Sequence, residues 1–111
     1  MGRKGAKLSG GATSVAETLV DNLQPIGGVS SKKMFGGYGV FADDVMFALV
    51  DSEGSAHLRA DESSIPRFEK AGSSKHDRMP YWEIPESVMD DSALLLEWAT
   101  EALAVAKAAK K

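Results

Sequence analysis

The apolar residues are densest in residues 33–50, and their pattern there is that of β-strands. β-Branched and aromatic side chains dominate this stretch, and the three glycines within residues 36–39 would be costly inside a helix. The polar pair Asp43-Asp44 between two apolar runs is typical of a tight hairpin turn. We therefore expect a bent or bulged strand at residues 34–37, a second strand at 38–42 and a third at 45–50.

The third of these strands is apolar on both of its faces. Strict alternation of side chains along a strand sets its residues on two faces: Val45, Phe47 and Leu49 on one, and Met46, Ala48 and Val50 on the other. A strand apolar on both faces is expected to be covered on both sides. The domain's own helices would supply one cover, and a second subunit would supply the other.

Helical spacing of apolar residues appears before, between and after the strands. Ser14-Val15-Ala16-Glu17 has the form of a capping box, and Pro25 ends the helix that begins there. A strand is expected at 55–60, followed by a short helix that Asp61 or Ser64 caps and that ends at Ala71. The next strand is expected at 79–84; because it contains Pro80, it either lies at an edge of the sheet or begins only at Tyr81. A single helical turn at 86–89 and a last helix at 92–109, capped by Asp91, complete the expected elements. This order predicts the α+β class, as a two-layer fold with an antiparallel sheet of about five strands backed by helices in the order α-β-β-β-β-α-β-α.

The length of 111 residues is that of a single domain. Residues 1–12 are glycine-rich and basic with almost nothing to bury, so we expect a disordered arm there and one domain over residues 13–109. The chain contains no cysteine, which excludes disulfides and thiolate sites and suits the cytoplasm, where we expect the protein. No apolar run approaches the roughly 20 residues that cross a bilayer, so no membrane partner is expected.

The charges are unevenly distributed along the chain. Six of the 13 basic residues lie near the two ends, which leaves seven bases against all 16 acids in residues 12–106. An acidic body repels phosphate backbones, so the folded part is a poor binder of nucleic acid. The basic ends leave open a weak, salt-sensitive contact with nucleic acid. They are Arg3, Lys4, Lys7, Lys107, Lys110 and Lys111.

No group of residues has the spacing of a catalytic or metal site. His57 and His76 lack acidic or histidine partners at a metal-ligand spacing, and we expect a half-exposed His57 in the sheet and a solvated His76 in a loop. The glycines of residues 36–39 are followed by a strand, whereas a phosphate cradle is followed by a helix. The acid pairs Asp43-Asp44 and Asp90-Asp91 are typical of turns and helix caps. We therefore expect no enzyme activity, no metal and no cofactor.

The aromatic residues near the C-terminal end favour packing or protein contact. Tyr81, Trp82 and Trp98 come without interleaved basic residues, unlike a base-stacking platform. Trp98 falls on the core stripe of the last helix, whereas one of Tyr81 and Trp82 must face away from the helices. The expected interface residues are Tyr38, Val40, Met46, Ala48, Tyr81 and Trp82.

Two stretches resemble the N-terminal domain of the TfoX (Sxy) competence regulators and their single-domain relatives. The first reads MFGGYGVF over residues 34–41, followed by VMFAL over residues 45–49. The second reads MPYWEIPE over residues 79–86, followed by Asp90 or Asp91 and by LLLEWA over residues 94–99. Their order and spacing also agree, and the resemblance covers about residues 13–106.

The resemblance implies a two-layer architecture similar to type III secretion chaperones, and it implies no enzyme activity. In the full-length regulators a C-terminal domain follows, and the whole protein promotes transcription of competence genes with a cyclic-AMP-responsive activator. The 111 residues here do not include that second domain. Our leading hypothesis is a non-enzymatic domain that regulates through protein contacts, as a homodimer or with another protein. The alternatives are a nucleic-acid-associated factor that uses the basic ends, and a small ligand-binding protein or enzyme.

Overall fold

A computed structural model describes residues 11–34, 36–76 and 79–110 of the chain. In chain order its elements are α1 (Gly11–Asn22), the 3-10 turn η2 (Gln24–Ile26), β1 (Ser30–Met34), β2 (Gly37–Ala42), β3 (Val45–Val50), β4 (Ala56–Arg59), α2 (Ile65–Lys70), β5 (Tyr81–Glu83), α3 (Glu86–Met89) and α4 (Ser92–Lys110). This is the α+β order that the sequence predicts, and β3 has the predicted bounds.

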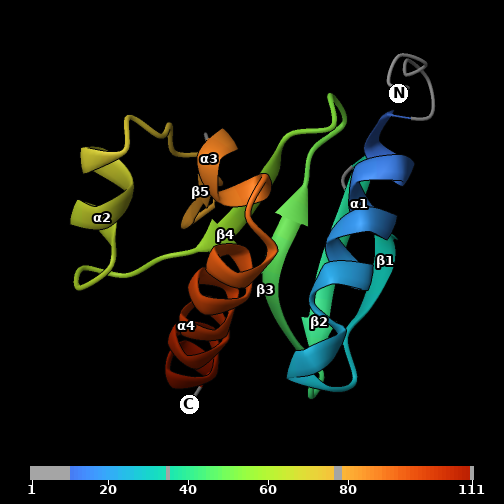
Figure 1. Ribbon diagram of the computed structural model, residues 1–111. Coiled ribbons are helices and arrows are strands. Elements are labelled where there is room, and N and C mark those ends of the chain that lie inside the picture. Colours follow the sequence, from blue (N-terminus) through green and yellow to red (C-terminus); the bar gives the residue numbers. More distant parts are fainter. Residues whose placement is uncertain (1–10, 35, 77–78, 111) are drawn as a thin grey trace.

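The five strands form one antiparallel sheet in the order β1-β2-β3-β4-β5 (Figure 1). The turn between β2 and β3 is the predicted one at Asp43-Asp44, with φ angles of 53° and 64°. Two successive residues with positive φ give the type I′ geometry that matches the twist of a hairpin. Aspartate tolerates this conformation better than most residues, which explains why the turn occurs at this pair.

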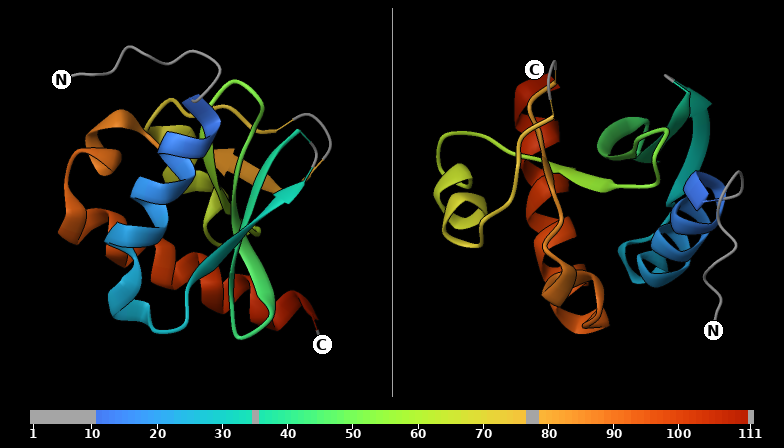
Figure 2. Two further views of the ribbon diagram at one scale, coloured as in Figure 1. Left: turned by 90° about the vertical axis from the view of Figure 1, so that its right-hand side faces the viewer. Right: turned by 90° about the horizontal axis from the view of Figure 1, so that it is seen from above.

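The helices form the second layer of the fold. Helix α1 contacts β1, β2 and β3, and α4 contacts β3 and β4, so the two helices share the sheet and also touch each other (Figures 1 and 2). Helix α4 begins at the predicted cap, because the Asp91 carboxylate accepts hydrogen bonds of 3.1 Å from the backbone N–H groups of Ala93 and Leu94. The sheet and its helices therefore form the predicted two layers.

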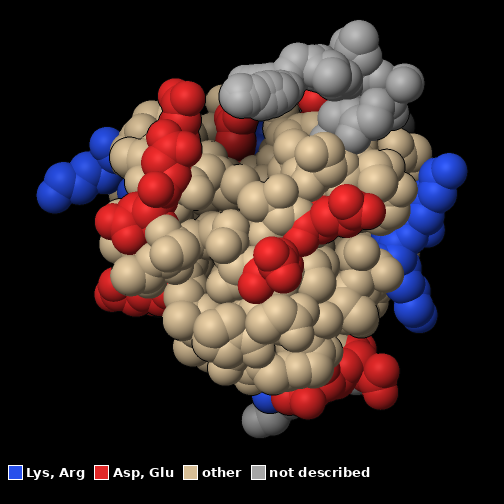
Figure 3. All heavy atoms as spheres, turned by 45° about the vertical axis from the view of Figure 1, so that its right-hand side comes forward, with Lys and Arg blue, Asp and Glu red and all other residues tan. Residues whose placement is uncertain are grey.

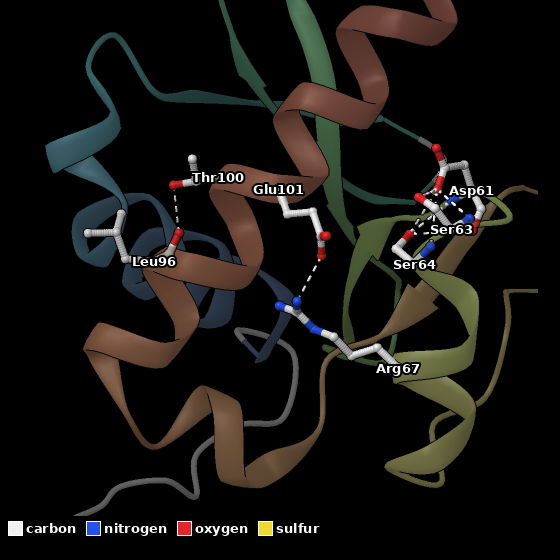
Figure 4. Close-up of polar contacts among 7 residues, drawn as sticks. All are labelled: Asp61, Ser63, Ser64, Arg67, Leu96, Thr100 and Glu101. Carbon is white, nitrogen blue, oxygen red and sulfur yellow. Dashed lines mark hydrogen bonds and ion pairs between the residues drawn. The ribbon is translucent and has the colours of Figure 1, made fainter.

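Helix α2 lies outside this layer, beside β5 and α4. An ion pair of 3.0 Å joins Arg67 on α2 to Glu101 on α4 (Figure 4). The Arg67 guanidinium also lies 4.1 Å from the centre of the Trp98 ring, and Phe68 is buried against the same ring. The Asp61 carboxylate accepts hydrogen bonds from Ser63 and Ser64 just before the helix, and these bonds lower its pKa. Asp61 thus shapes the turn that leads into α2. The N-cap residue is Ser64, and its side chain makes no capping hydrogen bond to the helix, so the predicted side-chain cap is absent.

The register of the sheet separates its two faces. Cross-strand partners point to the same side of a sheet. One row across the strands contains Val40, Ala48, Leu58 and Trp82, and the neighbouring row contains Lys32, Gly39, Leu49, His57 and Glu83. The first row is buried in the hydrophobic core with residues of α1 and α4, whereas Leu49 lies outside that core. We call the side of the sheet that carries the first row the core face, and the side that carries the second row the second face.

Two sequence predictions about local structure were wrong. Helix α1 begins at Gly11, so Ser14 lies inside the helix and the predicted capping box does not start it. Gly11 and Ala12 are also helical, whereas the rest of the arm predicted at residues 1–12 lies outside the described residues. The expected bulged strand at residues 34–37 is replaced by the end of β1 at Met34 and a turn at Gly36 with φ of 77°.

The bulge lies instead in β3. Val40 pairs with Ala48 and Phe41 pairs with Met46, so Phe47 is an extra residue between the two pairs. A bulge of this kind breaks strict alternation. Met46 therefore lies on the second face while Ala48 lies on the core face, which corrects the prediction that both residues share one face.

Candidate protein-contact surface

Three half-buried apolar side chains gather on the second face, around a glycine. A Cβ atom added at Gly39 would lie 2.5 Å from the Met34 sulfur, 3.0 Å from the Met46 sulfur and 3.0 Å from Cε1 of Phe41. The three side chains therefore meet over Gly39, because this position has no side chain to separate them. We call Met34, Phe41 and Met46 the Phe41 patch. Each of its members is partly exposed to solvent.

The Phe41 patch lies beside the edge of the sheet. Met34 is the last residue of β1, the first strand in the sheet order, and the other four residues of β1 are exposed. The Lys32 ammonium nitrogen lies 5.4 Å from the centre of the Phe41 ring, in the geometry of a cation–π contact. The candidate surface thus combines the apolar side chains of the Phe41 patch, the positive charge of Lys32 at its border, which we call the cationic rim, and the exposed edge strand β1.

The two predicted candidates at the start of β5 do not reach this surface. Tyr81 lies on the second face but is only 2% exposed, and its hydroxyl donates a hydrogen bond of 3.1 Å to the Met46 carbonyl. Burial raises the pKa of Tyr81, and Arg59 lies 5.8 Å from the centre of its ring. Trp82 points to the core face, is 9% exposed and contacts Phe68. These aromatic residues stabilise the fold and offer no exposed stacking platform.

The remaining candidates correct the sequence-based list further. Val40 and Ala48 are completely buried in the core, where no partner can reach them. Tyr38 lies on the core face, and its hydroxyl is 2.7 Å from the hydroxyl of Thr13 on α1. Among the predicted interface residues, Met46 alone belongs to the Phe41 patch. The sequence-based list omitted Phe41 and Met34, although the alternation of β2 puts Phe41 and Val40 on opposite faces.

The fold brings the two histidines together, which the sequence did not predict. The rings of His57 and His76 meet edge to face, with 5.5 Å between their centres. His57 is 6% exposed, which corrects the prediction of a half-exposed residue, and its Nδ1 lies 3.0 Å from the Ser55 carbonyl oxygen. Within the described residues, no three histidine, aspartate or glutamate side chains are placed to hold a metal ion.

Burial is the largest influence on His57 and lowers its pKa, because the imidazolium form loses hydration. His76 lowers the pKa further, while the hydrogen bond to Ser55 and the charges of Asp51 and Glu83 raise it. The unfolded chain therefore binds a proton at a higher pH than the folded chain does. Above the ordinary histidine pKa of about 6.5, His57 is neutral in both states and the free energy of unfolding is at its full value. As the pH falls from there toward the folded-state pKa, the unfolded chain takes up the proton first, and the free energy of unfolding decreases.

This linkage gives a prediction for thermal unfolding. The melting temperature of the wild type is expected to fall on acidification below about pH 6.5, and His57→Gln is expected to flatten that part of the profile. Circular dichroism melts at closely spaced pH values measure both profiles. A variant whose profile runs parallel to that of the wild type would show that His57 does not carry the effect.

On one side of the protein, the charged side chains are mainly acidic. On the side shown in Figure 3, acidic side chains are spread over the surface and the basic ones stand at its margins. Lys107 forms an ion pair of 2.7 Å with Asp43, and this contact lowers the pKa of that aspartate. Arg3, Lys4, Lys7 and Lys111 lie outside the described residues, so the contact expected of the basic ends stays a prediction.

The chain is thus a small α+β domain whose sheet carries the Phe41 patch on its second face. The model of the TfoX N-terminal domain family matches residues 21–106. The chain therefore belongs to the TfoX N-terminal domain family, as the resemblance in its two motifs predicted. No curated protein matches the chain. The described helices include none that is both long and apolar enough to span a bilayer.

Proposed function

We propose that this chain is a non-enzymatic protein-contact domain of the cytoplasm that serves the regulation of transcription, in processes of the competence type. Membership of the TfoX N-terminal domain family supports the regulatory setting. The single observation that carries the protein contact is the Phe41 patch, where three apolar side chains stay partly exposed on the second face. Apolar groups that meet at the surface are typical of interaction sites.

A symmetric homodimer is the simplest form of this contact. A twofold axis would set the Phe41 patch of one subunit against the same patch of the other, so that one surface is enough for both partners. Aromatic and methionine side chains are also enriched at the centres of protein interfaces. The cationic rim at Lys32 would remain at the border of such an interface, where charge is tolerated.

Light scattering of wild type and Phe41→Ser at micromolar concentration tests the homodimer. The wild type is expected to be a dimer, and the variant is expected to dissociate about thirtyfold more readily, as at a typical hot spot. Leu94→Ser is the matched control, because Leu94 is also half-buried but lies on α4, away from the second face. A wild-type chain that stays monomeric throughout the micromolar range would contradict the homodimer.

A further inference from the structure

The outer edge of β1 has no partner among the described residues. β1 stands first in the strand order and pairs with β2 alone, and Ser30, Ser31, Lys32 and Lys33 are all exposed. In an edge strand, alternate backbone N–H and C=O groups point away from the neighbouring strand, and these groups can pair with another chain. β1 therefore offers a row of backbone donors and acceptors beside the Phe41 patch.

The opposite edge of the sheet is closed by the chain itself. The segment before β5 folds back along it, so that the Glu83 N–H donates a hydrogen bond of 2.9 Å to the Ser74 carbonyl. The His76 N–H likewise donates a hydrogen bond of 2.8 Å to the Tyr81 carbonyl, and Lys75 forms a β-bridge with Trp82. In the part of the chain that the structure describes, β1 is thus the edge that remains free to accept a strand.

The charges on β1 select its partner. The strand contains no acidic residue, and its successive residues Lys32 and Lys33 point to opposite faces of the sheet. Lysines on an edge strand keep similar edges apart, because like charges on neighbouring strands repel. A second copy of β1 would bring four lysines together. An acidic strand would instead be attracted on both faces at once.

We propose that the outer edge of β1 binds an extended acidic segment of a partner protein, which joins the sheet as a sixth strand. Two successive acidic residues of that segment lie beside Lys32 and Lys33, one on each face, and an apolar residue next to them lies beside Met34 and the Phe41 patch. Backbone hydrogen bonds supply the affinity, and the paired charges fix the register. This inference deepens the proposed protein-contact function by naming the chemistry of the partner, and it uses the edge of the sheet instead of its second face.

The probe is a capped synthetic peptide of sequence Thr-Val-Glu-Glu-Val-Thr, added to the ¹⁵N-labelled chain of 111 residues. We expect its amide shifts to concentrate in residues 30–34, and we expect no binding of the peptide in which lysines replace both glutamates. Lys33→Glu is expected to weaken binding about tenfold, since one attraction becomes a repulsion. Lys70→Glu is the matched control, because it changes the net charge equally from an exposed position on α2.

Several results would overturn the inference: absence of binding, equal binding of both peptides, shifts centred outside β1, or equal affinity in Lys33→Glu and Lys70→Glu. Circular dichroism establishes that each variant is folded, and Lys33→Gln, with an expected intermediate affinity, supports the role of charge. In the absence of peptide, concentration-dependent shifts of Ser30, Ser31 and Lys33 without shifts at Phe41 or Met46 would show that a second copy occupies the edge, which also overturns the inference. A monomeric chain that binds the acidic peptide would refute only the homodimer, and a dimer that ignores the peptide would refute only the acidic strand.

Discussion

Phe47→Ala is expected to lower the free energy of unfolding by about 3–5 kcal/mol, the range for truncation of a buried aromatic residue. Phe47 is fully buried and is among the largest such side chains in the protein, and it is the extra residue of the bulge in the central strand. The total free energy of unfolding of such domains is about 5–15 kcal/mol, so this variant is expected to lose a large part of its stability. Urea unfolding measures the change.

Met46→Ala provides the matched comparison, because Met46 precedes Phe47 but lies half-buried on the second face. Its truncation is expected to cost about 1 kcal/mol or less, since much of the side chain is in contact with water before the change. A similar loss for both variants would contradict the difference in burial between Phe47 in the core and Met46 on the second face.

Gly37→Ala is expected to destabilise the protein by about 3 kcal/mol, the upper part of the range for an overpacked site. A Cβ atom at Gly37 would overlap the Val50 carbonyl oxygen and approach the backbone of Asp51 within 2.9 Å. Backbone atoms cannot swing aside as side chains do, so the β2–β3 pairing at Tyr38 and Val50 would have to open.

The control for this variant is Gly39→Ala, which belongs to the same strand. The atoms closest to its added Cβ are the ends of the Met34, Met46 and Phe41 side chains, and the two methionines are flexible. Its loss of stability in urea is therefore expected to be clearly smaller. Equal losses for Gly37→Ala and Gly39→Ala would contradict the close backbone approach at Gly37.

Much of the fold follows from local patterns in the sequence. β3 was predicted with its observed bounds, because an apolar run lies between the Asp43-Asp44 turn and Asp51. α4 was predicted within one residue at its C-terminal end, because Asp91 caps it and its core stripe is continuous. Such elements carry their own signals for starting, turning and ending, so neighbouring residues are enough to locate them.

β1 could not be predicted in the same way. Its residues Ser30–Met34 include two serines and two lysines, with neither alternation nor β-branched residues to indicate a strand. The strand forms because β2 offers it hydrogen-bonding partners, which is a tertiary effect. The contact of His57 with His76 depends likewise on the segment that folds back along β5.

The candidate surface was missed in part because of one inserted residue. The bulge at Phe47 reverses the alternation of β3, so Ala48 is buried while Met46 remains on the second face. Strict period-two counting cannot detect a bulge when every residue of the strand is apolar, since no polar residue marks the change of face. The Phe41 patch itself depends on Gly39 and on the pairing of β1 with β2.

The most direct test of the protein-contact role is amide hydrogen exchange of the wild-type chain at low and at high micromolar concentration. Edge strands normally exchange fast, so an interface over the Phe41 patch should slow exchange as the concentration rises. The account predicts added protection in residues 30–42 and at Met46, with none in α2. Exchange that is independent of concentration, or protection centred on α2, would contradict it.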